Sequence, residues 1–225
     1  MKKREKRSLY MGIILIALFL LWTILIKIVD VQMIGETGQK IGFATLNGWF
    51  HKITGVHFGL YNLTDWLGLV PVFVCLLFGV IGLKQLIQRR KLLSVDLDIL
   101  FLGAYYLLVI LCYIIFEMYP INYRPVLIEG RMEASYPSST TLLVLSVMPT
   151  LVGQVERRLL NKTVKKVIKV FSIGFIVGMV VGRLISGVHW ITDIVGAILL
   201  SMGLFYLYQA AVSNCCKKMM ICEGE

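Results

Sequence analysis

Long apolar runs, separated by clusters of basic residues, constrain the fold of this chain more than any other feature. Of its 225 residues, 58% carry hydrophobic side chains, and the mean hydropathy is +0.80. A helix needs about 20 apolar residues to cross the hydrocarbon core of a bilayer. Because lipid offers no hydrogen bonds to the backbone, a spanning segment must satisfy its own N–H and C=O groups, as a helix does. The sequence therefore predicts an all-α integral membrane protein and excludes a soluble domain.

Six runs approach the length of a membrane-spanning helix, and the fourth of them is short. They are expected near residues 9–29, 66–87, 97–118, 139–155, 167–188 and 191–212. This layout predicts a single membrane domain over residues 1–225. Between the first two runs, residues 30–65 carry aromatic side chains and several glycines, which are typical of an outer loop that lies at the membrane interface.

The basic residues gather at alternate ends of these runs. They open the chain, follow the second run at residues 89–91 and follow the fourth run around Lys165. Because basic loops are retained in the cytoplasm, both termini are predicted to be cytoplasmic and the chain is placed in the plasma membrane. Membrane topology thus explains the formal charge of +10, and no nucleic-acid partner is expected.

Three ionisable residues interrupt the apolar sequence around the junction of the last two runs: Arg183, His189 and Asp193. Charged groups at membrane depth are costly, so they usually mark a functional site. The spacing of four residues predicts that His189 and Asp193 share one helix face, where the carboxylate orients the imidazole. The alternatives are that Arg183 snorkels at a helix end and that Asp193 stabilises a helix dipole.

Two further polar segments are predicted on the same outer side. Arg124 and Pro125 follow the third run, and residues 137–140, Pro-Ser-Ser-Thr, precede the fourth. Hydroxyl residues at a helix start lie beside free backbone N–H groups and the positive end of the helix dipole, which together bind anions. A phosphate site is therefore predicted from four side chains: Arg124, Arg183, Ser138 and Ser139.

In order and spacing, these segments resemble the three motifs of the type 2 phosphatidic acid phosphatase (PAP2) family, membrane lipid phosphatases related to vanadium haloperoxidases. The third motif is matched by Arg183, His189 and Asp193, with Gly182 in its serine position. The other two are matched by the pairs Arg124-Pro125 and Pro137-Ser138.

The resemblance implies a haloperoxidase-like bundle of six transmembrane helices with an active site that faces outside. It implies that His189 attacks phosphorus and forms a phosphohistidine, while Asp193 supports the imidazole and the arginines and serines bind the phosphoryl oxygens. The family's mechanism needs no metal, and no cofactor is expected.

The first two motifs also depart from the family pattern. Glu117 stands where the first motif has lysine, and Ser139-Thr140 stands where the second has glycine and histidine. The family's histidine protonates the leaving oxygen, and the hydroxyl of Thr140 is too weak an acid to replace it.

A substitute acid is one way to restore the missing proton donor. The candidates are Glu117, Glu129 and Glu133, if burial raises a carboxyl pKa, or a histidine of the 30–65 segment. An ion pair with Arg124 or Arg131 is the alternative role for these glutamates.

The missing acid handicaps some leaving groups more than others. General acid catalysis contributes about 10²–10⁴-fold for a basic leaving group such as an alkoxide. A phosphate leaving group, with a pKa of about 6, needs little help. The sequence therefore predicts hydrolysis of a lipid phosphate or a polyprenyl diphosphate, such as the undecaprenyl carrier of bacterial membranes. The alternative is a PAP2-like protein that binds or moves phospholipids without hydrolysing them.

Overall fold

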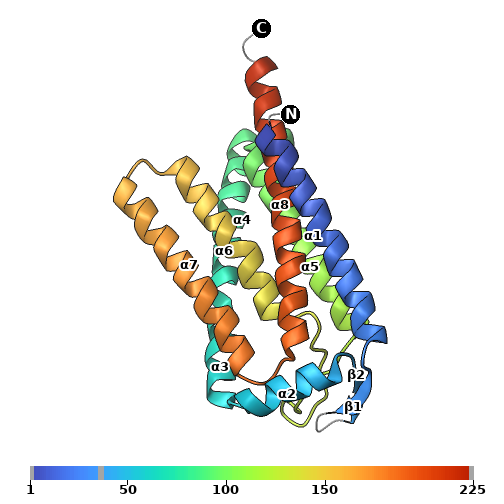
Figure 1. Cartoon of the computed structure of the whole chain (residues 1–225). Coiled ribbons are helices and arrows are strands. Elements are labelled where there is room, and N and C mark those ends of the chain that lie inside the picture. The colour runs from blue at the N-terminus through green and yellow to red at the C-terminus, as the bar shows by residue number, and fades with distance from the viewer. Residues whose placement is uncertain (1–2, 35–37, 223–225) are drawn as a thin grey trace.

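The computed structural model shows long helices packed side by side, with a smaller layer folded across one end of them (Figure 1). It describes residues 3–34 and 38–222, and the side chains of residues 5–34 and 38–214. In chain order the elements are α1 (Lys3–Ile28), β1 (Gln32–Ile34), β2 (Gln39–Ile41), α2 (Ala44–Thr54), α3 (Phe58–Leu67), α4 (Leu69–Arg89), the 3₁₀ turn η1 (Leu92–Ser94), α5 (Leu97–Met118), α6 (Ser139–Arg158), α7 (Lys162–Ile185) and α8 (Ile191–Cys222). The predicted helical class is confirmed.

Five helical segments in the described part of the chain are long and apolar enough to cross a membrane. They are Glu5–Ile28, Phe58–Arg89, Leu97–Met118, Lys162–Ile185 and Ile191–Asn214. The second of them joins α3 to α4 and is longer than the expected run at 66–87. α7 begins five residues before the expected run, and α8 continues past its expected end at residue 212.

The remaining expected span, near 139–155, is the helix α6, which does not reach the apolarity of the other five. It carries buried polar side chains along its length, among them Thr141, Ser146, Thr150 and Gln154. α6 packs against α4, α5, α7 and α8, so its surface meets protein more than lipid. A helix inside a bundle can keep polar residues because its neighbours supply hydrogen bonds, as the Tyr106 hydroxyl does for Thr150 at 2.7 Å.

Residues 30–65, expected to be an interfacial loop, are folded in the described part of that segment. β1 and β2 form an antiparallel pair, and α2 lies across the ends of the long helices (Figure 1). Asn47 of α2 donates from its amide to the Thr192 hydroxyl at 3.0 Å, and the Trp22 indole donates to the Thr192 carbonyl at 3.1 Å. The segment is therefore fastened to the start of α8.

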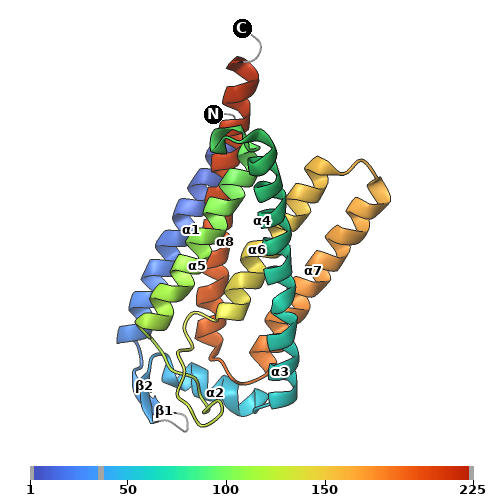
Figure 2. The ribbon, with the colours of Figure 1, turned by 180° about the vertical axis from the view of Figure 1, so that it is seen from behind.

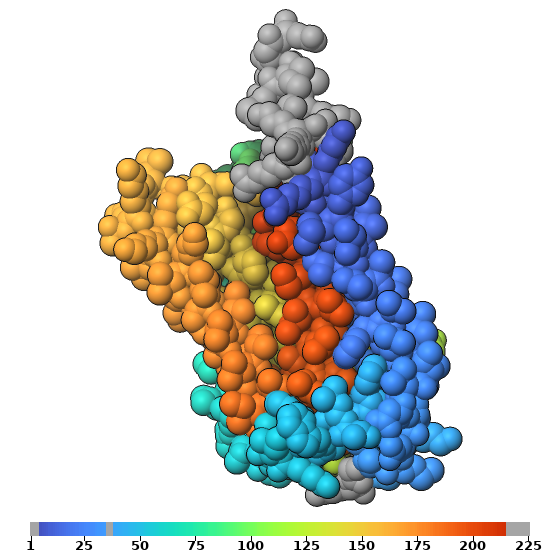
Figure 3. Space-filling model, viewed as in Figure 1, coloured from blue at the N-terminus to red at the C-terminus, as the bar shows by residue number. Residues whose placement is uncertain are grey.

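The first and last helices form the most extensive helix pair of the bundle, and Figure 3 shows α1 lying along α8. Glycines allow this close approach. A Cβ added at Gly12 would lie 2.8 Å from Leu207, and one added at Gly203 would lie 2.8 Å from Ile16. Small residues at such contacts let two helix backbones come together.

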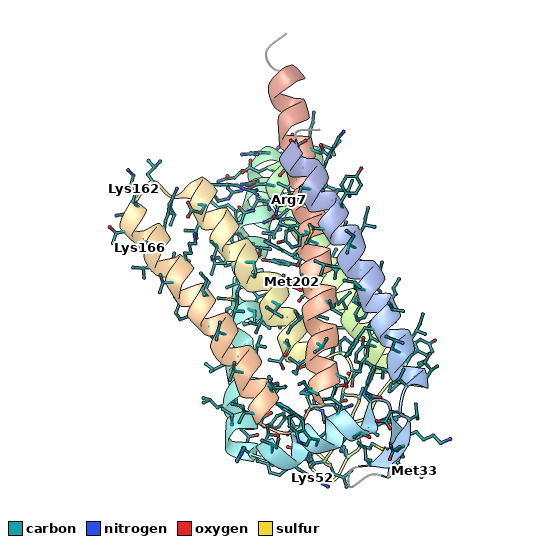
Figure 4. The ribbon with its side chains drawn as sticks, viewed as in Figure 1. Arg7, Met33, Lys52, Lys162, Lys166 and Met202 are labelled. Carbon is teal, nitrogen blue, oxygen red and sulfur yellow. The ribbon has the colours of Figure 1, made fainter. Side chains whose placement is uncertain are left out.

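The bundle has two chemically different ends. The hairpin end carries β1, β2, α2 with its residue Lys52, and α3 (Figures 1 and 4). The basic end carries both termini, the α6–α7 connection and the start of α7 with Lys162 and Lys166. At the basic end, Arg89 pairs with Asp96 at 2.8 Å and Arg158 with Asp98 at 2.9 Å. These ion pairs join α4, α5 and α6.

Candidate active site

The residues of the third motif meet where α7 turns into α8 at the hairpin end. Arg183 lies in the last turn of α7, His189 in the connection at residues 186–190, and Asp193 in the first turn of α8. All three are buried, with at most 3% of each residue exposed. The connection turns at Gly187, whose φ of 70° is a conformation that glycine adopts without strain. A Cβ at Gly187 would also overlap the carbonyl oxygen of Gly55.

His189 presents one ring nitrogen without a partner. Its Nδ1 lies 3.2 Å from the carbonyl oxygen of Ser135. Because a carbonyl only accepts, this contact assigns the proton to Nδ1 and leaves a lone pair on Nε2. Nε2 is buried and has no hydrogen-bond partner among the described residues. Burial, followed by the positive charges of Arg124 and Arg183, lowers the pKa of His189 well below its usual range, which keeps the imidazole neutral.

Asp193 reaches His189 less directly than the sequence predicted. The prediction that the two share a helix face is wrong, because α8 begins at Ile191 and His189 precedes it. Asp193 Oδ2 lies 3.8 Å from His189 Nδ1 and accepts from the Ser135 hydroxyl at 2.6 Å and from the Trp190 backbone N–H at 2.9 Å. Ser135 therefore contacts both side chains and connects them.

Arg183 is held in place by α3 and by Thr140. Its Nη2 donates to Thr140 Oγ1 at 2.7 Å and to Asp65 Oδ1 at 3.2 Å, and its Nη1 donates to Thr64 Oγ1 at 3.4 Å. Gly182, which replaces the family's serine, lets α3 approach, since a Cβ there would lie 2.8 Å from Thr64. The Nε of Arg183 is buried without a partner among the described residues.

Arg124 reaches the same place from the segment between α5 and α6. Bridges between Tyr123 and Ala134 and between Ile128 and Arg131 fold residues 123–134 into a narrow loop. Arg124 Nη2 lies 3.1 Å from Glu133 Oε2, while Nε and Nη1 are buried without partners among the described residues. Both guanidinium groups lie over Tyr61 of α3, at 5.6 Å for Arg124 and 4.9 Å for Arg183. The ring thus brings two cations to one site.

The three hydroxyl residues predicted at the start of α6 take different positions. Ser138 is fully buried, and its hydroxyl donates to Thr141 at 3.1 Å. Ser139 lines a narrow pocket together with His189, Ser135, Glu117 and Tyr113. Thr140 faces Arg183 instead. The first turn of α6 has no side-chain cap, so its N–H groups face the region of Ser139 as an anion-binding helix start does.

A second, larger cavity adjoins the narrow pocket. It has a volume of about 440 Å³ and is lined mainly by apolar side chains of α4, α5 and α6. These three helices pack against one another and are seen from their outer side in Figure 2. Asp65 and Thr140 stand at its polar end, and Cys75, Tyr106 and Val147 lie deeper. Tyr113, Ser139 and Leu142 line both spaces.

The acidic residues near the site do not all lie where the sequence suggested. Glu133 takes the ion pair with Arg124 that was weighed as its alternative role, whereas Glu117 lines the pocket of His189. Glu129 lies at the tip of the loop with a φ of 50°. Asp65, which sequence reasoning missed, pairs with Arg183 beside Thr140.

Two other contributors, Tyr61 and Ser135, were also missed, and only Tyr61 has a sequence signal, which is weak. Tyr61, Thr64 and Asp65 stand three and four residues apart, a spacing that places them on one face of a helix. Ser135 carries no local signal, because it meets Asp193 across 58 residues of sequence.

The described residues contain no group of three or more histidine, cysteine, aspartate or glutamate side chains that could hold a metal ion. The site instead collects four buried polar atoms without partners among the described residues: Nε2 of His189, Nε and Nη1 of Arg124, and Nε of Arg183. Three of these are donors on cations and the fourth carries a lone pair. This arrangement suits an anion with an electrophilic centre.

Fold and site together define a helical membrane protein in which His189, Asp193 and two arginines are buried near one another. The sequence profile of the PAP2 superfamily matches residues 71–215, which include His189, Asp193 and both arginines. The chain belongs to the PAP2 superfamily, as its motifs predicted.

The fold is similar to that of a solved structure, described as the crystal structure of the first transmembrane PAP2 type phosphatidylglycerolphosphate phosphatase from Bacillus subtilis. The TM-score is 0.66 at 18% sequence identity, and the match covers 91% of this chain and 97% of the other. At this identity the likeness concerns the fold. No curated protein sequence matches the chain.

Proposed function

We propose that this protein is a membrane lipid phosphatase in which His189 attacks phosphorus without help from a metal ion and forms a phosphohistidine. One observation carries the proposal: the unpartnered Nε2 of a buried, neutral His189 lies in a site where two arginines keep unused donors. An unpaired buried donor costs about 1–3 kcal/mol. A phosphoryl group would satisfy these donors and place its phosphorus beside the lone pair.

The first step forms a bond between Nε2 and phosphorus while the bond to the leaving oxygen breaks. The imidazole becomes positively charged, and its Nδ1–H keeps the carbonyl of Ser135 as acceptor, with the carboxylate of Asp193 at 3.8 Å. Arg124 and Arg183 stabilise the charge on the phosphoryl oxygens, as fixed donors do in phosphoryl transfer. Water then attacks the phosphohistidine and releases phosphate.

The adjoining cavity supports a lipid substrate. Its apolar walls lie between α4, α5 and α6, and its polar end reaches Asp65 and Thr140. A hydrocarbon tail placed there gains roughly 25 cal/mol for each Å² of apolar surface removed from water. We therefore propose a lipid phosphate or a polyprenyl diphosphate, such as undecaprenyl diphosphate, as the substrate.

The orientation follows from the chemistry of the two ends. Lysines and arginines collect with both termini at the basic end, which we place in the cytoplasm of a cell with the protein in its plasma membrane. The site then faces outside. Single cysteines replacing Lys52 and Lys166, in a chain whose five native cysteines are changed to serine, test this. An impermeant thiol reagent added to intact cells should label only Lys52→Cys, and labelling of only Lys166→Cys would reverse the orientation.

The function is tested by phosphate release from purified protein, with chelator present, across lipid monophosphates and diphosphates. Wild-type protein should release phosphate and His189→Ala should not, with a loss of more than about 10⁴-fold for removal of a nucleophile. Acid-labile labelling of wild-type protein by substrate carrying radioactive phosphorus should disappear in the same variant. A wild-type protein that binds these lipids and releases no phosphate would instead be a lipid-binding member of the family.

A further inference from the structure

The site leaves one chemical requirement without an assigned residue, namely a proton for the leaving oxygen. This requirement rests on the proposed phosphatase function. In phosphoryl transfer the attacking and leaving atoms are roughly in line on opposite sides of phosphorus. The leaving oxygen therefore lies on the side of phosphorus away from His189.

The lipid tail is attached to the leaving group, so the tail shows where the leaving oxygen lies. With phosphorus in the narrow pocket beside His189 and the tail in the apolar cavity, the scissile oxygen sits at the junction of the two spaces. Tyr113, Ser139 and Leu142 are the residues that line both. The proton donor is expected among these three, since it must touch the atom that crosses from one space to the other.

Two of the three residues carry a hydroxyl proton, and they differ in acidity. The phenol of tyrosine has a pKa of about 10, which is far lower than that of the aliphatic hydroxyl of serine. Ser139 also begins α6, where the helix start favours a role at the phosphoryl oxygens. We propose that Tyr113 is the general acid that protonates the leaving oxygen, in the role that the family assigns to a histidine and Thr140 cannot fill.

The acidic residues nearby are less well placed for this step. Glu133 is paired with Arg124. Asp65 is paired with Arg183 and lines the larger cavity but not the narrow pocket. Glu117 lies one helical turn from Tyr113 along α5 and lines the narrow pocket but not the larger cavity. Thr140 already accepts a hydrogen bond from Arg183. Among these residues and Tyr113, only Tyr113 meets both spaces.

The proton balance closes over the two half-reactions. In the first, Nε2 bonds to phosphorus, the P–O bond breaks, and the leaving oxygen takes the phenolic proton, so that an alcohol departs and Tyr113 remains as phenolate. In the second, water attacks the phosphohistidine and gives a proton to the phenolate. The N–P bond breaks, inorganic phosphate leaves, and His189 and Tyr113 return to their starting states.

The test compares Tyr113→Phe with wild-type protein on a saturated polyprenyl monophosphate and the diphosphate with the same tail. The monophosphate releases an alkoxide, so its kcat should fall by about 10²–10⁴-fold in the variant, with KM unchanged within about threefold. The diphosphate releases a phosphate of pKa about 6, so its kcat should stay within about threefold of wild type.

Equal losses on both substrates would show that the ring only shapes the pocket, and an unchanged rate on the monophosphate would show that it donates no proton. Either result overturns the proposal. Glu117→Gln is the matched control, and a loss confined to the monophosphate in that variant would assign the proton to Glu117 instead. Phosphate release by the wild-type and His189→Ala proteins tests the phosphatase function separately. A wild-type protein that is inactive on both substrates would refute that function and, with it, the proton transfer from Tyr113.

Discussion

The two ends of the bundle both bring arginines together with carboxylates, yet they leave the arginines in different states. At the basic end, the side chains of Arg89 and Arg158 are 44% and 31% exposed, so water completes their hydrogen bonding. At the hairpin end, Arg124 and Arg183 are 9% and 1% exposed and keep unused donors. Ion pairs alone therefore do not indicate a site. The distinguishing feature is that unpaired donors of two buried arginines gather beside an unpaired ring nitrogen of His189.

The largest expected effect is a difference in kcat between variants of an arginine at the hairpin end and variants of an arginine at the basic end. Arg183→Gln removes a charged donor that we propose binds the phosphoryl oxygens, so we expect kcat to fall by about 10²–10³-fold. Arg158→Gln at the basic end should change phosphate release by less than about threefold, because its ion pairs stabilise only the fold. Phosphate release by the two purified variants measures the contrast, and equal losses would remove the distinction between the ends.

A second effect, of intermediate size, concerns pH. The pKa of His189, the proposed nucleophile, is lowered, so kcat/KM should not decline on the acid side at the ordinary histidine pKa of about 6.5. Stability behaves differently. As pH falls below about 6.5, the unfolded chain binds a proton at residue 189 that the folded chain does not, so folding becomes less favourable.

Two variants sharpen this prediction. Arg124→Gln removes one of the charges that lower the His189 pKa, and its acid limb of kcat/KM should move to higher pH. Arg157→Gln at the basic end should leave the limb in place. An acid limb near pH 6.5 in the wild type would contradict the assignment of a neutral, buried nucleophile.

The smallest effect concerns the carboxylates that accompany the arginines. The Asp65 side chain is 57% exposed although its partner Arg183 is 1% exposed, so water screens the carboxylate, and an asparagine would keep the acceptor oxygen. Asp65→Asn should therefore change the free energy of unfolding little, while inorganic phosphate should bind a few times more tightly because a competing anion is gone. Asp98→Asn should alter stability by a similar amount and phosphate binding not at all. Thermal unfolding with and without phosphate measures both quantities.

The parts of the molecule that sequence could predict are those set by local patterns. Apolar runs placed the helices, and α5 begins and ends at the predicted residues. The helix α6 was harder to recognise as a span, because the buried polar residues that it carries are tolerated only where neighbouring helices surround it. The spacing of His189 and Asp193 was read as helical, although the chain turns at Gly187 and the helix starts only at Ile191.

The candidate site could be predicted only where its residues belong to motifs. Arg124, Arg183 and His189 were named from the sequence, and both arginines lie close enough to His189 for their charges to lower its pKa. Tyr61 and Asp65 join them because α3 folds against α7, which depends on long-range packing at Gly182. No local pattern reports a contact of this kind, so the residues that hold the arginines became visible only in the folded chain.

The packing of α1 against α8 implies an order of assembly for this protein. During synthesis α1 is made first and α8 last, and contacts between segments so distant in sequence form late. The indole of Trp22 donates to the carbonyl of Thr192, the residue before Asp193, so the first helix steadies the last component of the site. A nascent chain that stops after α7 would already contain Arg124 and Arg183 but would lack His189. The protein can therefore gain activity only after its final helix has entered the membrane and met its first.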